Sequence, residues 1–322
     1  MTKTIVVIDG DIVAFRCAAS NEKRSIKATH KTTGQEIVCA HRTAFKEQIR
    51  DVFQPEEFDI VDVQTAEDIS HARHGMKTTV AALKKSCNAE EVEIYLYGKN
   101  NFRDSLPLPT KYKDRGGIKP TQLKECRKYL QEKMGAVIID NYEVDDKLAM
   151  RCHEGLQQGV KTIAATIDGD QNGVAGWMYN WNKHSEPFLV QGFGEIHLVK
   201  DNKDFDGYGR KFFYAQWVLG DSVDVFKPCE VAKKKFGVVS MYNLLKDCTN
   251  DKEAVQAVYN QYKSWYCPNG CEPVMYIDWQ GNSQSKTLIE LMDMYAACAH
   301  MLRWEGDVFN TEALLDKLGI TY

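Results

Sequence analysis

The sequence lacks the features that mark several special classes of protein. None of its apolar runs is long enough to span a bilayer, which argues against an integral membrane protein. The first residues lead at once into a strand-like apolar run, so we expect no signal peptide. There is no internal repeat and no low-complexity segment, which argues against repeat architectures and disordered chains.

Neither sign of charge dominates, and the cysteines form no dense framework. The 322 residues include 45 acids and 41 bases, a balance that argues neither for nor against nucleic acid. The ten cysteines are scattered, as expected for reduced thiols in a cytoplasm. Cys267 and Cys271 flank a turn and could form half of a zinc site, but no second pair or nearby histidine completes it.

Apolar periodicity indicates an α/β protein. Residues 4–8 form a continuous apolar run, typical of a buried parallel strand. Residues 92–170 alternate strand, helix, strand, helix and strand, the pattern of a parallel sheet with crossover helices. We also expect a β-hairpin around residues 31–34 and mostly helices after residue 211.

Acidic residues gather where the predicted strands end. The carboxyl ends of parallel strands lie at one edge of a sheet, so the first three groups of acids should converge. Carboxylates held this close either share protons or bind hard cations, and we expect two Mg²⁺ or Mn²⁺ ions that hydrolyse phosphodiesters. A solvated acidic helix start is the alternative for the second group taken alone. The four groups are Asp9 and Asp11; Glu143, Asp145 and Asp146; Asp168 and Asp170; Asp221 and Asp224.

Basic residues follow the strand that ends near residue 97, and a second basic run follows Asp224. Alone, each run would be read as a solvated surface. Beside an acidic metal pocket, the first run could bind the scissile phosphate and the second could bind backbone phosphates. Tyr112 or Phe102 could stack on an unpaired base. The basic residues are Arg103, Lys111, Lys113, Arg115 and Lys119, then Lys227, Lys233, Lys234 and Lys235.

The sequence resembles the 5′–3′ exonuclease and flap endonuclease family. The motifs that carry the resemblance occur in the family's order and extend over nearly the whole chain. The chain is most similar to its phage-encoded branch and to the N-terminal nuclease domain of bacterial DNA polymerase I. The matching segments are Ile8-Asp9-Gly10-Asp11 with Arg16, Phe102-Arg103, Tyr112-Lys113-Asp114-Arg115, Glu143-Val144-Asp145-Asp146, Thr166-Ile167-Asp168-Gly169-Asp170 and Gly220-Asp221-Ser222-Val223-Asp224.

The resemblance implies a PIN-like (resolvase-like) parallel β-sheet flanked by helices in residues 1–205. It implies a mostly helical, DNA-binding part in residues 206–322, with a helix–turn–helix unit at residues 221–237. The implied activity is metal-dependent hydrolysis of DNA at free 5′ ends or flaps, for replication, recombination or repair. RNA–DNA hybrids are a further substrate to consider. We expect a monomer in the cytoplasm with no membrane partner.

The resemblance also implies roles for single residues. The first metal ion would be held by Asp9, Glu143, Asp145, Asp146 and Asp168. The second would be held by Asp170, Asp221 and Asp224, with Asp168 shared. Lys113 and Arg115 would form a gateway over the active site, and Arg103 would support that region. DNA would be contacted by Lys111, Lys119, Lys227, Lys233, Lys234 and Lys235.

The chain departs from the family pattern at three places. Gly98 stands where much of the family has an aspartate, and Gly169 replaces the middle lysine of the Asp-Lys-Asp motif. The glycine-containing turns after Asp224 are missing, so the backbone should approach phosphate or K⁺ less closely. We therefore do not carry over the family's K⁺ site.

Two other functions fit parts of the sequence. A catalytically weak, nuclease-like protein would bind branched or single-stranded DNA without cutting it, and the departures at Gly98 and residues 225–237 favour this reading. A HAD-type phosphatase would use Asp9 as its nucleophile. That reading leaves the basic loop and the acids at 221 and 224 without a role.

Overall fold

The computed structural model describes residues 3–114, 116–270 and 273–322, which form two compact units. The larger unit comprises residues 1–9, 82–117 and 137–322, and the smaller unit comprises residues 10–81 and 118–136. Within the described ranges, none of the helices combines the length and the apolar character needed to cross a membrane. Arg115 and Cys271, both named in the sequence analysis, lie outside the described residues.

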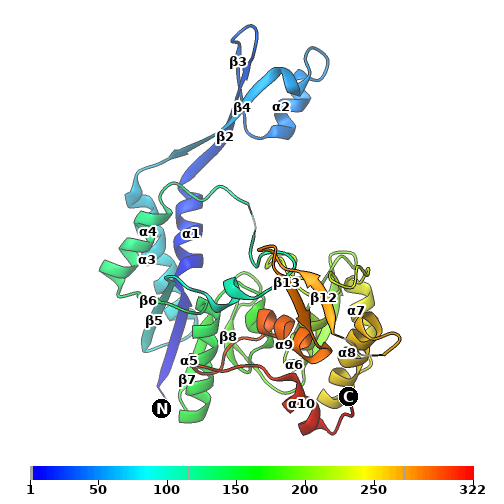
Figure 1. Cartoon of the computed structure of the whole chain (residues 1–322). Helices are drawn as coiled ribbons and strands as arrows, with labels where there is room; N and C mark the ends of the chain where they lie inside the picture. The colour runs from blue at the N-terminus through cyan, green and yellow to red at the C-terminus, as the bar shows by residue number, and fades with distance from the viewer. Residues whose placement is uncertain (1–2, 115, 271–272) are drawn as a thin grey trace. The chain divides into compact units, whose positions relative to one another are not determined.

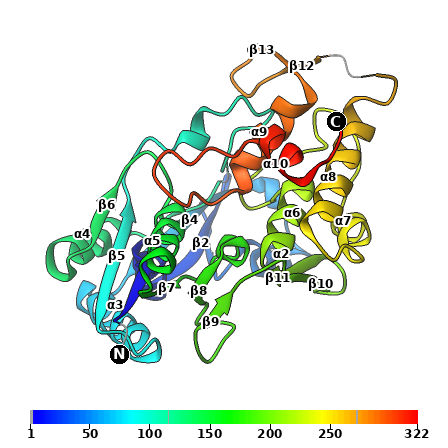
Figure 2. The same ribbon diagram turned by 90° about the horizontal axis from the view of Figure 1, so that it is seen from below.

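A six-stranded sheet forms one part of the larger unit, beside a mostly helical part (Figures 1 and 2). Its first five strands in spatial order are parallel, and β9 pairs antiparallel with β8. The central strand β1 is buried because apolar residues fill both of its faces. The expected parallel sheet is therefore confirmed. In spatial order the strands are β6 (Val137–Ile139), β5 (Glu91–Tyr97), β1 (Thr4–Asp9), β7 (Lys161–Ala165), β8 (Gly176–Tyr179) and β9 (Phe188–Val190).

Helix α5 (Val144–Gln158) connects β6 to β7 and packs against the sheet. Its apolar residues recur on one face, where Leu148 and Cys152 are buried against Val7. Gly159 ends the helix in the left-handed conformation that glycine adopts at little cost. Two short 3₁₀ helices, η2 (Phe102–Ser105) and η3 (Asp170–Gly173), follow the ends of β5 and β7.

The rest of the larger unit is mostly helical, as expected. Trp217 lies in its core, where the indole N–H donates to Met292 O and the Tyr262 hydroxyl donates to Trp217 O. The expected domain boundary after residue 205 falls inside β11, which pairs with β10. The elements are β10 (Glu195–Val199), β11 (Asp204–Tyr208), α6 (Arg210–Leu219), α7 (Val238–Leu245), α8 (Asp251–Tyr266), β12 (Val274–Ile277), β13 (Ser283–Lys286), α9 (Leu288–Ala299) and α10 (Thr311–Leu318).

Residues 221–237, expected to form a helix–turn–helix unit, consist of turns and extended chain without a helix. Helix α6 ends at Leu219 before the segment, and α7 begins at Val238 after it. Figures 1 and 2 show α6, α7 and α8 next to one another, and these helices contact each other in pairs. The helix–turn–helix unit is therefore not confirmed.

The smaller unit contains an antiparallel sheet in the order β3-β2-β4 and a small apolar core around Phe45 and Phe58. The turn between β2 and β3 has Gly34 at φ +71°, which confirms the expected hairpin. Helix α1 packs against α4. The elements are α1 (Gly10–Ser20), β2 (Glu22–His30), β3 (Glu36–Cys39), α2 (Arg42–Ile49), η1 (Pro55–Glu57), β4 (Phe58–Ala66), α4 (Leu123–Met134) and α3 (Ile69–Ser86), whose last residues belong to the larger unit.

The structure explains why glycine follows β5. The Gly98 amide donates to Ile139 O at 2.7 Å, and a Cβ at this position would lie 2.1 Å from Asp140 Oδ1. The same Asp140 oxygen accepts the amide of Lys99 at 2.9 Å. A side chain at position 98 would therefore displace the Asp140 carboxylate.

We predict that Gly98→Ala lowers the free energy of unfolding by about 1–3 kcal/mol, because the added methyl group overpacks the strand ends. Gly117→Ala is the control, since no atom lies within 4 Å of a Cβ there. Urea denaturation of both variants measures the difference. Equal stability of the two variants would contradict the explanation, whereas partial recovery in Gly98→Ala/Asp140→Gly would support it.

Candidate metal centre

A buried carboxylate stands at the start of α5, close to the ends of β1 and β7. Asp145 is 7% exposed, and its Oδ1 atom is buried without a hydrogen-bond partner. Burial raises the pKa of Asp145 well above its ordinary value, and repulsion by Asp168, Asp9 and Asp170 raises it further. The fold thus brings acids from three separate parts of the chain close enough to repel one another.

Asp170 links this group to the acids that follow α6. Burial raises the pKa of Asp170 well above its ordinary value, and Asp168 and Asp224 add to the shift through repulsion. The Gln216 amide donates to Asp170 Oδ1 at 2.7 Å and partly offsets this effect. Asp168 acts on both Asp145 and Asp170, so one continuous set of carboxylates runs through the site.

A single lysine bridges two of these acids. Lys113 Nζ lies 2.7 Å from Glu143 Oε1 and 3.4 Å from Asp224 Oδ1. The Lys113 amide also donates to Asp224 O at 2.9 Å, and the Tyr112 hydroxyl donates to Asp224 Oδ2 at 2.7 Å. Although burial opposes its charge, Glu143 and Asp224 raise the pKa of Lys113. Lys113 therefore stays protonated and partly neutralises the acidic site.

Arg103 and Asp146 form a fully buried ion pair behind the site. The guanidinium donates to both Asp146 oxygens, at 2.6 Å and 3.0 Å, and to the carbonyl oxygens of Ala297 and His300. Asp146 also accepts the amides of Glu143 and Leu302, each at 3.0 Å. Although burial opposes its charge, Asp146 holds the pKa of Arg103 well above its ordinary value. Each group is 0% exposed.

These contacts change the interpretation of both residues. The resemblance placed Arg103 near the reaction and Asp146 on a metal ion. In the structure their polar atoms bind each other and the backbone, which leaves no face of either residue open to substrate. We therefore interpret them as positioning residues that hold the start of α5 against the end of α9.

The predicted DNA-contacting residues are distributed over the surface. Lys111 lies over the Trp279 ring, with Nζ 5.1 Å from the ring centroid. Lys119 is exposed and belongs to the smaller unit. Lys227, Lys233, Lys234 and Lys235 are exposed in the segment between α6 and α7.

Sequence reasoning missed several groups that touch the acids. Gln216 and Asn101 donate to Asp170 and Glu143, and no sequence signal pointed to either contact. Tyr112 was noticed as a ring that could stack on a base, but it is 2% exposed and its hydroxyl binds Asp224. The stacking role is therefore wrong for Tyr112 in this structure.

The donor set is chemically suited to hard divalent cations. Ionised carboxylates are the ligands that Mg²⁺ and Mn²⁺ prefer, and the partnerless oxygen of Asp145 has the form of an open ligand position. Among the residues that the structure describes, no three candidate ligands are already grouped so that they could hold a metal ion. The Lys113 ammonium, by pairing with Glu143 and Asp224, supplies part of the positive charge that a metal ion would bring.

Comparison with known proteins supports the fold. No protein-family profile and no curated protein sequence matches the chain. Two solved structures from bacteriophage T5 are similar to it over 98% of its length, each with a TM-score of 0.50 and 12% identity. One is a flap endonuclease pseudo-enzyme–product complex with DNA and metal ions, covered over 98% of its chain. The other is a 5′-exonuclease mutant, covered over 96%. The chain therefore has the fold expected from its resemblance to phage-type 5′–3′ exonucleases.

We predict that Arg103→Met lowers the free energy of unfolding by about 3–5 kcal/mol, because it leaves the buried Asp146 carboxylate without its partner. The control is Arg42→Met, which removes an exposed ion pair with Asp62 and should change the free energy of unfolding far less. Thermal and urea denaturation measure both. A similar decrease in the free energy of unfolding in the two variants would contradict a structural role for Arg103.

We further predict that Asp145→Asn stabilises the metal-free protein by about 1 kcal/mol near neutral pH, because it removes one repelling charge. The raised pKa of Asp145 means that the folded state binds more protons, so the wild type loses stability as the pH rises above about 4. The gain should therefore grow with pH. Urea denaturation in EDTA at several pH values measures this gain in the free energy of unfolding. Asp201→Asn, a change at an exposed acid, is the control. A loss of stability in Asp145→Asn would contradict the repulsion.

Proposed function

We propose that this protein is a metal-dependent nuclease that hydrolyses phosphodiester bonds in DNA at free 5′ ends or flaps. The observation that carries the proposal is the buried Asp145 carboxylate, whose Oδ1 has no hydrogen-bond partner among the described residues, beside Asp9, Asp168 and Asp170. A protein gains nothing from such repulsion unless a cation offsets it. The solved structures with this fold include one bound to DNA and metal ions, which supports the same activity here.

Two divalent cations, Mg²⁺ or Mn²⁺, would supply water activation and stabilisation of the leaving oxygen. The first would be held by Asp9, Glu143, Asp145 and Asp168, and the second by Asp170, Asp221 and Asp224, with Asp168 shared. Asp146 is left out of this set because Arg103 and two backbone amides occupy its oxygens. Its part would be to fix the start of α5, and with it Asp145.

Lys113 would act on the substrate. Its ammonium already binds two carboxylates, and a phosphate entering the site would compete for the same donor. Held there, Lys113 would neutralise charge that develops on the phosphate oxygens. The tyrosine beside it, Tyr112, keeps this loop attached to Asp224. The remaining basic residue of the motif, Arg115, would share the gateway role expected from the resemblance.

Two observations favour the second function, DNA binding without cleavage. Lys113 pairs with Glu143 and Asp224, and a lysine that stays there would keep a second cation out. The aspartate that much of the family has after this strand is also absent, since Gly98 stands there. A single assay separates the two functions.

We predict metal-dependent products from a 5′-labelled flap duplex in Mg²⁺ or Mn²⁺, and none in EDTA. A blunt duplex run in parallel separates exonuclease from flap cutting by product length on a gel. Asp168→Asn should lower the rate by more than about 100-fold, the upper end for residues that only support metal ligands. Its DNA binding in EDTA should remain.

Asp201→Asn serves as the control, because this acid is exposed and lies outside the carboxylate set. Full Mg²⁺-dependent cleavage by Asp168→Asn would refute the proposed centre. Tight binding without product under any metal would instead establish the DNA-binding function.

A further inference from the structure

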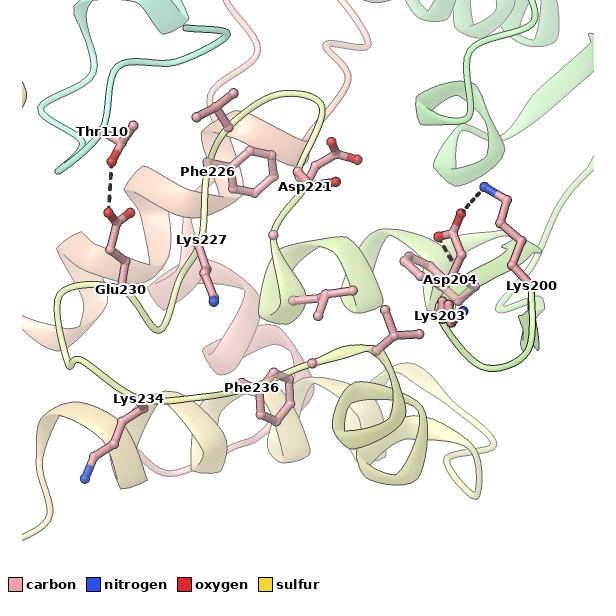
Figure 3. Close-up of a pocket in the computed structure, with 17 residues that line it drawn as sticks. Thr110, Lys200, Lys203, Asp204, Asp221, Phe226, Lys227, Glu230, Lys234 and Phe236 are labelled. Carbon is pink, nitrogen blue, oxygen red and sulfur yellow. Dashed lines mark hydrogen bonds and ion pairs between the residues drawn. The ribbon is translucent and has the colours of Figure 1, made fainter. Parts of the chain in front are cut away.

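A cavity of about 870 Å³ lies in the larger unit, apart from Asp145 and the residues around it. The β10–β11 turn forms one side, and the chain between α6 and α7 forms the other (Figure 3). Its size is within the range of cavities that bind small ligands. Of its lining residues, the proposed catalytic step uses only Asp221, which connects the cavity to the carboxylate set.

Lysines line the cavity on both sides. Lys200 and Lys203 come from the β10–β11 turn, and Lys227 and Lys234 come from the opposite segment. All four are exposed, and only Lys200 has an ion pair within the described ranges, with Asp204 at 2.6 Å. Glu230 is engaged by the Thr110 hydroxyl at 2.9 Å. Three ammonium groups are therefore available to an anionic ligand.

Aromatic rings line the space between these lysines. Phe236 is partly exposed and packs edge-on against Trp265, with ring centroids 5.1 Å apart. Phe205 is also partly exposed and packs on Phe212 at 5.1 Å. In Figure 3 Lys227 and Phe236 lie on the side formed by the chain between α6 and α7, and Lys200 and Lys203 lie on the side of the β10–β11 turn. The cavity thus combines aromatic rings that pack on neighbouring rings with exposed lysine ammonium groups.

We infer that this cavity binds an unpaired stretch of DNA, with backbone phosphates on the lysines and a base against Phe236 or Phe205. Proteins that bind single strands combine a positively charged groove with aromatic rings on which bases stack. A duplex keeps its bases stacked inside, so only its phosphates would reach the lysines and the rings would stay unused. The inference rests on the proposed function, because it assigns a strand of the same substrate to this site.

Fluorescence anisotropy in EDTA tests the inference without cleavage. The probes are labelled oligothymidylate of about twelve nucleotides, a length typical of single-strand sites, and a blunt duplex. Lys203→Gln/Lys234→Gln should weaken single-strand binding about tenfold and lower the slope of log K against log salt by about 1.4. Phe236→Leu should weaken it about tenfold with an unchanged slope. Duplex binding should change little.

The matched control is Lys252→Gln/Lys317→Gln, which removes two exposed lysines outside the cavity. Circular dichroism melting checks that every variant is folded. If the cavity variants bind the single strand as tightly as the wild type does, the inference is overturned. A loss of affinity for the duplex alone would also overturn it. If the wild type cuts flaps in Mg²⁺ while the cavity variants bind normally, the inference alone fails. If the wild type neither binds nor cuts DNA, the proposed function fails as well.

Discussion

Repulsion among buried carboxylates is the constraint on which this structure depends. Asp145 is buried and Asp170 is partly buried, and burial together with repulsion by several neighbouring carboxylates raises the pKa of both well above the ordinary value. The chain offsets part of this energy with one cation, Lys113, placed between Glu143 and Asp224. The acids at the sheet and those after α6 are therefore joined through a lysine from a loop far away in sequence. Binding of divalent cations would compete with this lysine for the same oxygens.

A second cationic side chain, Arg103, fixes the elements that carry the acids around Lys113. Arg103 joins the loop after β5 to the start of α5 through Asp146, and to the end of α9 through two carbonyl oxygens. A buried ion pair is weak support for stability compared with apolar packing, but its geometry is specific. This specificity matters because Glu143 and Asp145 lie beside Asp146 on the same helix start. The positions of Glu143 and Asp145 thus depend on a pair whose polar atoms bind each other and the backbone.

The sequence predicted the parts of the fold that follow local rules. Continuous apolar runs predicted β1, β5 and β7, and acids that follow β1, β6 and β7 predicted a carboxylate centre, because both signals arise within a few residues. Contacts across the chain carried no such signal. The bond from Gln216 to Asp170 and the burial of Tyr112 depend on tertiary packing. Arg103 and Asp146 show the limit most clearly, since a matching motif gave their identities but only packing shows that they face each other.

Backbone strain lies between the carboxylate centre and the lysine-lined cavity. Val225 has φ +58° and Lys233 has φ +52°, a conformation that side chains other than glycine adopt at a cost of about 1–3 kcal/mol. The chain can hold Val225 there because Asp221 and Phe226 pair through their backbones on either side of it. Gly220 is required at the same place, since a Cβ would lie 2.2 Å from Phe226 O. This tight turn directs Asp224 toward Lys113 and Lys227 toward the cavity, so one strained segment serves both surfaces.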